Sequence, residues 1–477
     1  MNIMANFNII IPFTFITKKF NSRHSSSLLQ IMRNFNHSSI LRSQEYYLVK
    51  SHHGENYRLH LSKSRHLVGI RSTRGIRELN EDRYQAMVLK LSDDRKNLKD
   101  DIIVNQPILD VKNIENPKIN GEEAQSNQSC YFAVFDGHGG PHCADYLTAT
   151  LHKNIEDVKA SDADNIITSL RSVGGYFVRY KPASLESLLS PEVADISKKR
   201  PSNQKSSLRK FSSTPTSQLL SPSTLQQPST QALLPSLSPT ALASPSPPPK
   251  TLTMEQRLLL AFLKTDSELM EDKSVGSTAS VALIKSLDKL PFWTSNSLEI
   301  SIAHVGDTKI LLCEVEKGNS VPLTYDHHPS SIVETDRLRK SGGFIITDSF
   351  GSEMYLGRLA NSRSFGDFKL KRFGVSAEPE ISTLKLRGKD FAFMVLVSDG
   401  VTSVLSNQEI VDCIKNYNDP TLGASKLVDL AEELGSDDNI TAMVVRLPGW
   451  GSPMTDQTKD LREYRLVRNS TFLNRRM

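Results

Sequence analysis

The sequence is poor in cysteine and aromatic residues and contains no long hydrophobic run. Its four cysteines among 477 residues form no Cys-x-x-Cys pair, which argues against a disulfide framework and against a thiolate zinc site. No stretch approaches the ~20 consecutive apolar residues of a membrane-spanning helix, so we expect no stable membrane insertion. Basic residues outnumber acidic ones by only 58 to 53, and the surplus lies in residues 1–44, so the neutral remainder predicts no nucleic-acid partner.

Acidic residues are absent from residues 1–44, which are rich in Ser and Asn and carry five basic side chains. This composition is typical of a mitochondrial transit peptide. Pro12 interrupts the apolar run from Phe7 to Ile16, and the basic residues follow that run, which argues against a secretory signal. We therefore predict a mitochondrial protein, in the matrix or the intermembrane space, with a disordered basic tail as the alternative.

Two internal stretches lack the pattern of a folded core. Residues 201–250 contain 13 Ser, 10 Pro and no acidic residue, so we predict a disordered insertion over 181–250. Residues 91–128 are charged and show little periodicity, which predicts a loop. Because the patterns on both sides of these stretches belong together, we expect one domain over 45–447, followed by a basic C-terminal tail over 448–477.

The remaining chain alternates between short β-rich runs and amphipathic helical patterns. Strands cluster with strands and helices pair with helices, without the alternation of a parallel sheet, so the predicted fold class is α+β with antiparallel sheets. Gly306 and Asp307 separate two of the runs and are predicted to form a hairpin turn. The predicted strands are 130–135, 279–284, 298–304, 309–315, 391–397 and 440–445, and the predicted helices are 141–158, from Thr253 onward, 406–414 and 421–434.

Acidic residues recur at the ends of these strands. Asp136 and Asp399 each end a buried run in Asp-Gly, Asp438 precedes a strand, and further acids lie at Asp307 and at Glu81-Asp82. Several carboxylates brought together repel one another unless a cation neutralises them. Oxygen ligands favour hard divalent cations, so the pattern predicts Mg²⁺ or Mn²⁺, with two ions able to clamp a phosphoryl group.

The chain at this point resembles the metal-dependent protein serine/threonine phosphatases of type 2C (PPM). The resemblance covers about 65–90, 130–158 and 253–447. It implies a four-layer αββα sandwich, in which two antiparallel sheets are flanked by antiparallel helices, with the metal site at one edge. Nine motifs occur in the family's order: RELNED (77–82), FDGHGG (135–140), GSTAS (276–280), VGDTK (305–309), LTYDHHP (323–329), RLANSRSFGD (358–367), SAEPEI (376–381), SDG (398–400) and DDNIT (437–441).

The resemblance also implies a metal ligand set. Asp136 would bridge two ions, and Asp399 with Asp438 would complete the first. The carbonyl oxygen of Gly137 and the carboxylate of Glu81 would complete the second.

Four further residues receive roles by the same resemblance. Arg77 would bind the substrate phosphate through its planar fork, with a surface ion pair to Glu78 or Glu81 as the alternative. His138 would protonate the leaving oxygen, with a structural turn histidine as the alternative. Asp82 would orient bound water from outside the ligand set. Asp307 would help to hold a third ion, although a plain turn residue explains it equally well.

One position departs from the family's pattern. Ser403 stands where many members have a further aspartate, and a hydroxyl is a poorer Mg²⁺ ligand than a carboxylate, which argues against a third ion. The predicted function is hydrolysis of phosphoserine and phosphothreonine in mitochondrial proteins by water activated between two ions, in a monomer. The alternative is a weak or inactive phosphatase-like protein that binds phosphoproteins. A metal nuclease is disfavoured because the chain has no basic stripe.

Overall fold

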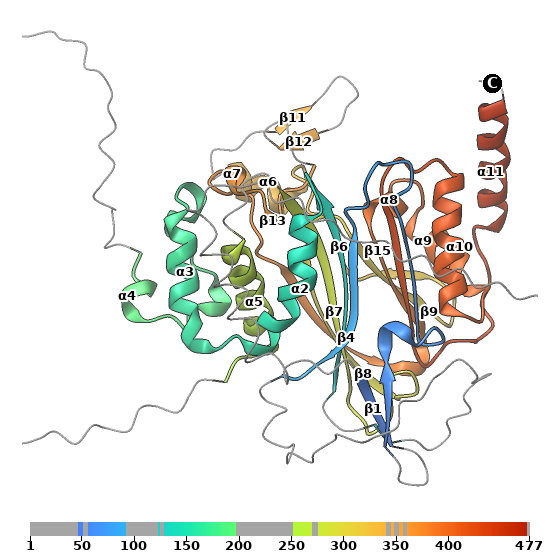
Figure 1. The fold of residues 1–477 in the computed structure, drawn as a ribbon, viewed down its shortest axis with the longest axis horizontal. Coiled ribbons are helices and arrows are strands. Elements are labelled where there is room, and N and C mark those ends of the chain that lie inside the picture. The colour runs from blue at the N-terminus through green and yellow to red at the C-terminus, as the bar shows by residue number, and fades with distance from the viewer. Residues whose placement is uncertain are drawn as a thin grey trace, which may run out of the picture.

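Two antiparallel sheets face each other at the centre of the molecule, and helices cover their outer faces (Figure 1). The computed structural model describes residues 46–50, 56–91, 123–124, 128–196, 251–269, 275–339, 345–347, 353–355 and 360–474. The first sheet has the strand order β14 (Glu380–Arg387), β8 (Ser297–Val305), β7 (Gly276–Ser286), β6 (Ser129–His138) and β4 (Arg83–Leu89), with β13 (Phe365–Gly366) paired to β7. The second sheet has the order β10 (Ser320–Pro322), β9 (Lys309–Glu314), β15 (Phe391–Val397), β16 (Ile440–Arg446) and β3 (Val68–Thr73).

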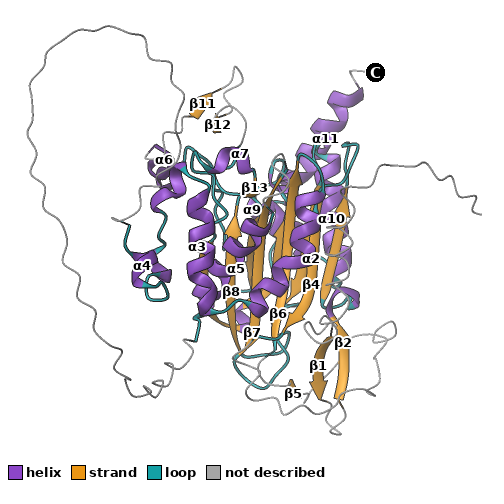
Figure 2. Cartoon of the chain, turned by 60° about the vertical axis from the view of Figure 1, so that its left-hand side comes forward, coloured by secondary structure: helices purple, strands orange, loops and turns teal. Residues whose placement is uncertain are grey.

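One group of helices packs on each sheet, which completes four layers (Figure 2). On the first sheet lie α2 (His142–Asp157), α3 (Ala163–Ser172) and α5 (Met254–Glu268). On the second lie α9 (Asn407–Lys415) and α10 (Pro420–Glu433). Short helices connect these elements: α4 (Pro191–Ala194), α6 (Ile332–Arg339), α7 (Phe368–Lys371) and α8 (Asp399–Thr402). This arrangement confirms the predicted α+β sandwich.

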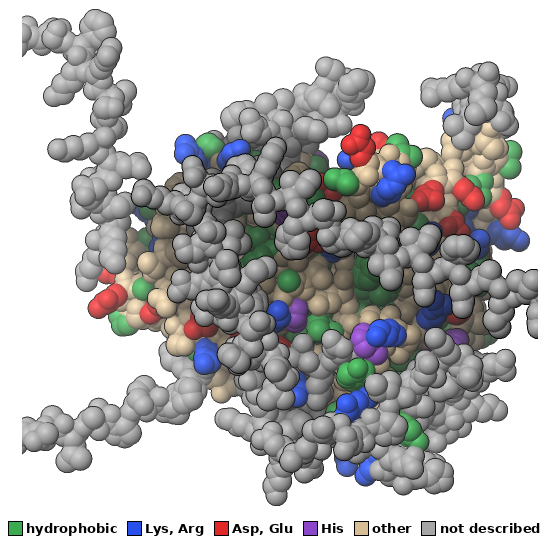
Figure 3. Space-filling view, viewed as in Figure 1, with side chains coloured by type: hydrophobic (Ala, Val, Ile, Leu, Met, Phe, Trp, Pro, Cys, Tyr) green, Lys and Arg blue, Asp and Glu red, His purple; other side chains and the backbone are tan. Residues whose placement is uncertain are grey.

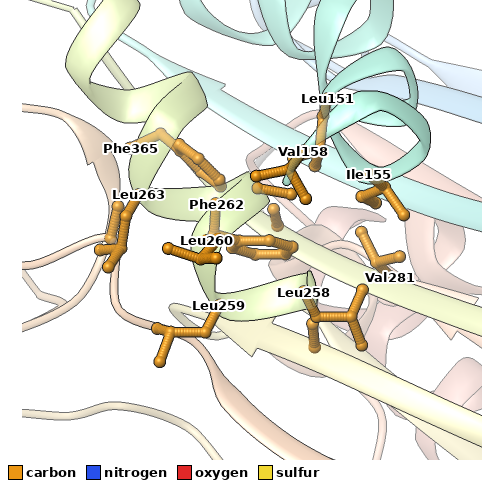
Figure 4. Close-up of a cluster of buried hydrophobic side chains, with 14 of the residues drawn as sticks. Leu151, Ile155, Val158, Leu258, Leu259, Leu260, Phe262, Leu263, Val281 and Phe365 are labelled. Atoms are coloured by element: carbon orange, nitrogen blue, oxygen red, sulfur yellow. The ribbon is translucent and has the colours of Figure 1, made fainter. Parts of the chain in front are cut away.

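The continuous apolar run in β6 reflects burial on both faces of the strand. Successive side chains of a strand point to opposite faces. Tyr131, Ala133 and Phe135 therefore pack beneath the helices α2 and α5, whereas Phe132 and Val134 pack between the two sheets. Figure 4 shows the first of these clusters, in which leucines of α5 meet Leu151 and Ile155 of α2.

Helix starts follow the sequence closely. Thr253 caps α5 in a capping box with Gln256, and Ser406 caps α9 in the same way with Glu409. The predicted helix over 421–434 is α10, which is followed by Gly435 at φ +90°. These predictions are confirmed. They succeed because each depends only on side chains within one turn of the helix end.

The predicted hairpin at Gly306-Asp307 is wrong. β8 pairs with β7 and β14 in the first sheet, whereas β9 pairs with β10 and β15 in the second. The segment therefore carries the chain from one sheet to the other at the sandwich edge. Short-range turn residues cannot distinguish a hairpin from such a crossing, because partner choice depends on distant strands.

The predicted insertion begins too early, and the predicted tail is not a plain tail. Residues 181–196 include α4, and Leu185 and Leu189 are buried against the core. Residues 197–250 lie outside the described residues. The C-terminal region forms the helix α11 (Lys459–Asn474), in which Arg465 Nη1 lies 2.5 Å from Glu409 Oε1. Arg462 pairs with Asp456 in the same region, so Arg462 and Arg465 both form contacts that a free tail would not have.

A small three-stranded sheet lies apart from the two main sheets in the strand pairing. Its order is β2 (Asn56–His60), β1 (Tyr46–Lys50) and β5 (Glu123–Ala124). β5 lies within the predicted loop 91–128, whose residues 92–122 and 125–127 lie outside the described part. Residues 1–45 also lie outside it. A further two-stranded sheet pairs β11 (Ile345–Thr347) with β12 (Glu353–Tyr355).

The surface of the described residues mixes both signs of charge. In Figure 3, both Lys or Arg and Asp or Glu side chains are visible on the parts of this face that grey atoms do not cover. Among the helices that the structure describes, none combines the length and apolar character needed to cross a bilayer.

Candidate metal centre and active site

Three carboxylates meet where β6 ends and α8 begins. The ends of these two elements lie at the upper edge of the sandwich in Figure 1. Asp136 lies near the end of β6, Asp399 is the first residue of α8, and Asp307 lies in the link from β8 to β9. One carboxylate oxygen from each lies within 4.8 Å of those of the other two. Long-range pairing of the strands thus gathers side chains that are far apart in the chain.

The strand β6 continues through the residues that were expected to follow it. Asp136 pairs with Thr278 of β7, and the pairing extends to His138 opposite Gly276. β6 lies in the interior of its sheet, between β4 and β7. Extended backbone at Asp136 and His138 directs alternate side chains to the same face, so the carboxylate and the imidazole belong to one site.

The facing carboxylates hold protons more strongly than free ones do. Burial, then the charge of Asp399, raises the pKa of Asp136 well above its usual value. Burial and the charge of Asp399 also raise the pKa of Asp307 to about 7. For Asp399, burial and the charge of Asp438 raise the pKa to about 6. Such a cluster favours a bound cation, which would remove both the repulsion and the retained protons.

Asp82 adds a second indication that the site suits a cation. Its side chain is 2% exposed, and its Oδ2 accepts hydrogen bonds from Ser398 Oγ at 2.8 Å and Thr441 Oγ1 at 2.7 Å. Its Oδ1 is buried and has no hydrogen-bond partner among the residues that the structure describes. A buried carboxylate oxygen without a partner is costly in a protein interior. This oxygen and the all-oxygen donor set therefore fit Mg²⁺ or Mn²⁺ with its bound water.

Arg77 contacts an acidic residue other than those proposed for its alternative role. Its Nη2 donates to Asp438 Oδ2 and its Nε to the carbonyl oxygen of Asp437, both at 2.8 Å. The alternative pairing with Glu78 or Glu81 is therefore not the arrangement observed. Arg77 links the 74–80 turn to the acidic end of the β16 segment, with half of its side chain exposed.

Asn439, for which the sequence predicted no role, holds the same turn in place. Its Nδ2 donates to the carbonyl oxygens of Arg74 and Leu79, and its Oδ1 accepts from the amide of Glu81. Glu81 and Asp438 thus border the site but lie outside the group of three carboxylates. The sequence signals for Asn439 were its position directly after two aspartates and its place in the motif DDNIT (437–441).

His138 has a carboxylate partner that the sequence analysis also missed. Its Nε2 lies 2.9 Å from Asp367 Oδ2, although 229 residues separate the two in sequence. Burial lowers the pKa of His138, but hydrogen bonding and the charge of Asp367 outweigh burial and leave the pKa raised. Asp367 is the last residue of the motif RLANSRSFGD (358–367), for which the sequence predicted no individual role.

Ser403 does not join the carboxylate group. Its side chain is exposed, and its Oγ donates to the carbonyl oxygen of Gly400 at 3.3 Å. Asp307, in contrast, lies with Asp136 and Asp399 and is not a residue of a hairpin turn.

Comparison with known proteins gives a consistent pattern. The family model described as Protein phosphatase 2C matches residues 229–440. Protein phosphatase 2C homolog 4 of Schizosaccharomyces pombe is 33% identical over 343 residues, which cover 70% of this chain and 75% of that protein. Protein phosphatase 1K, mitochondrial, of Xenopus laevis is 39% identical over 207 residues, which cover 42% of this chain and only 52% of that protein.

Among solved structures, a serine-threonine phosphatase 2C from Toxoplasma gondii aligns with a TM-score of 0.45 at 17% identity, covering 85% of this chain and 97% of that one. The sequence relatives share far more identical residues over their matched lengths than this structure does.

Proposed function

This chain belongs to the protein phosphatase 2C family of metal-dependent protein serine/threonine phosphatases, and we propose that it hydrolyses phosphoserine and phosphothreonine at the sandwich edge. The observation that carries the proposal is the group formed by Asp136, Asp307 and Asp399. None of the three forms an ion pair with a Lys or Arg in the part of the chain that the structure describes. A site of this kind is suited to a divalent cation and a phosphate ester.

We propose that Asp136, Asp399 and Asp438, with Glu81 and the carbonyl oxygen of Gly137, hold the metal ions. Bound Mg²⁺ or Mn²⁺ supplies a Lewis acid that lowers the pKa of water and offsets the charge of the phosphoryl group. Asp82 supports this set with a buried oxygen that is available to a bound water.

Arg77 and His138 supply the remaining chemistry in this proposal. Arg77 uses Nε and one Nη2 proton on Asp437 and Asp438, so the Nη1 donors are available to phosphate oxygens. His138 donates a proton to the serine or threonine oxygen as the phosphorus–oxygen bond breaks. The raised pKa of His138 favours the protonated ring that this step needs.

The test is release of inorganic phosphate from a phosphoserine peptide by the full chain. We expect turnover with Mn²⁺, none after addition of EDTA, and recovery when Mn²⁺ is restored in excess. Asp136→Asn is the matched control, because it keeps the size of the side chain and removes one charge. Tight peptide binding without turnover in Mn²⁺ would instead support the phosphoprotein-binding alternative, which the exposed Ser403 favours.

We also propose that the substrates are mitochondrial phosphoproteins. Two observations support this: the acid-free composition of residues 1–44, and the relative from Xenopus laevis that carries the word mitochondrial in its name. Import of the full chain into isolated mitochondria, with protection from added protease, would test the location. A chain that lacks residues 1–44 is the control, and equal protection of both would contradict the proposal.

A further inference from the structure

A turn at Gly366-Asp367 holds the Asp367 carboxylate beside one nitrogen of the His138 ring. The carboxylate Oδ2 of Asp367 lies 2.9 Å from His138 Nε2 and accepts a second hydrogen bond from Ser364 Oγ at 2.6 Å. The Asp367 side chain is 9% exposed, whereas the His138 side chain is 38% exposed. The buried partner is therefore the fixed one, and the imidazole is the partner that reaches solvent.

The backbone at Asp367 adopts the left-handed conformation, which costs free energy for a residue with a side chain. Its φ of +50° makes it the one non-glycine residue with positive φ in the described part of the chain, and Gly366 before it has φ +70°. Left-handed backbone is uncommon for residues with a side chain and is concentrated at functional sites. The turn re-aims the chain so that the carboxylate of Asp367 reaches His138.

The helix α5 contacts this turn and fixes its position. Phe365 packs against Phe262 of α5, with ring centroids 5.1 Å apart, as Figure 4 shows. The amide of Gly366 donates to Asp266 Oδ1 at 2.9 Å. Lys371, which is 1% exposed, forms an ion pair with Asp266 and donates to the carbonyl oxygen of Ser364. The turn thus has apolar and ionic attachments to a rigid element.

Gly276 provides the space for the pair. A Cβ atom on Gly276 would lie 2.3 Å from His138 Nε2 and 2.4 Å from Asp367 Oδ2. Both distances are far below van der Waals contact, so any side chain here would separate the imidazole from the carboxylate. The amide of Asp367 also donates to the carbonyl oxygen of the adjacent Val275 at 3.0 Å. β7 and the Asp367 turn therefore enclose the pair together.

From this geometry we propose that Asp367 is the positioning residue of His138, and that Nδ1 is the ring nitrogen that protonates the leaving oxygen. The inference rests on the proposed function. Asp367 keeps the Nε2 proton in its hydrogen bond, and the Nδ1 proton passes to the serine oxygen as its bond to phosphorus breaks. A carboxylate that orients a histidine in this way resembles the supporting role of aspartate in hydrolase triads.

The test compares two substrates in the full chain with Mn²⁺. A phosphoserine peptide has an alkoxide leaving group that needs a proton, whereas p-nitrophenyl phosphate has a stable phenolate leaving group that does not. Asp367→Gly removes the carboxylate and tolerates the positive φ, so the turn can persist. We expect kcat for the peptide to fall about 100-fold with KM little changed, and kcat for p-nitrophenyl phosphate to fall far less.

Two controls separate positioning from loss of structure. Asp412→Asn alters another buried aspartate, which is paired with Lys415 away from His138, and should lower stability without changing the ratio of the two turnover numbers. In a His138→Gln background, Asp367→Gly should cause no further loss of peptide turnover, because residues that act as a unit are non-additive. Equal losses on both substrates, or a further loss in the double variant, would overturn the proposal.

A readout that does not depend on activity keeps the inference apart from the proposed function. In the histidine-labelled full chain, the Nε2–H of His138 should give a downfield proton resonance that is identified by its loss in His138→Gln. The same resonance should disappear in Asp367→Gly and remain in Asp412→Asn. Its absence from the native chain would refute the positioning role, whereas a native chain that shows it but lacks phosphatase turnover would refute only the proposed function.

Discussion

The carboxylates of Asp136, Asp307 and Asp399 face one another, whereas the carboxylate of Glu334 lies between two arginines. Glu334 is 2% exposed, with Arg337 Nη2 at 2.5 Å and Arg363 Nη2 at 2.6 Å. Burial raises the pKa of Glu334, but hydrogen bonds and charge from Arg363 and Arg337 outweigh burial and leave the pKa far below its usual range. At the sandwich edge, burial and neighbouring acids act together and raise the pKa values.

The difference shows how buried carboxylates serve two purposes. Where the chain supplies the cation, as at Glu334, the carboxylate joins α6 to the segment that leads to the Asp367 turn. At the sandwich edge, where the described residues supply no paired Lys or Arg, the carboxylates repel one another and are suited to a cation from solution. A buried carboxylate that is paired with arginine indicates a structural role. Buried carboxylates that face one another at a strand end indicate a binding role.

The largest expected effect is on catalysis at the sandwich edge. Asp136→Asn should lower kcat for a phosphoserine peptide about 10³-fold, because electrostatic stabilisation of this kind contributes on that scale. It should not lower the stability of the metal-free protein, because it removes a repelled charge. Phosphate release and thermal unfolding in EDTA measure the two effects. A clear loss of stability in EDTA would mean that Asp136 is a structural residue.

The opposite pattern is expected at the arginine-paired site. Glu334→Gln should lower the free energy of unfolding by about 3 kcal/mol, because it removes the buried charge that pairs with the partly buried Arg337 and Arg363. Activity per folded molecule should be largely retained. Urea unfolding monitored by circular dichroism measures the change. Asp390→Asn is the control: its ion pair with Arg387 is exposed, so a loss below about 1 kcal/mol is expected.

The two sites should also differ in how pH and metal affect stability. The pKa values of about 6 for Asp399 and about 7 for Asp307 lie above the usual 3.8, so the folded state retains protons that the unfolded chain releases. Stability in EDTA should therefore fall as pH rises from about 4 towards about 7. Mn²⁺ binds the ionised carboxylates, so its stabilising effect should grow over the same interval. Thermal melts at several pH values, with EDTA or Mn²⁺, measure both trends, and a flat EDTA profile would contradict them.

The smallest expected effect concerns Ser403. Ser403→Asp adds a carboxylate about one helical turn beyond the site's own aspartate, Asp399, and should lower the Mn²⁺ concentration for half-maximal activity a few-fold. Metal titration of phosphate release measures this value. Ser403→Asn is the control of similar size without the charge. An equal change in both variants would show that charge at this position does not affect metal binding.

Local sequence signals predicted much of the fold. The capping boxes at Thr253 and Ser406, the apolar runs of β6 and β15, and the acids at their ends depend on residues close together in the chain. The predicted hairpin at Gly306-Asp307 was wrong because the pairing of a strand depends on residues that are far away in the chain. Residues 181–196 were misassigned because their few apolar side chains become buried only against helices already in place.

The sequence alone determined the family resemblance and the identity of the acidic residues, because both depend on residue types in a fixed order. Only the tertiary structure decided which carboxylates face one another, that Arg77 contacts Asp438, and that Asp367 contacts His138 across 229 residues. Contacts of that separation arise from strand pairing and from the close approach that Gly276 permits. Neither leaves a periodic signal in the chain, because packing between distant elements depends on shape and not on local residue pattern.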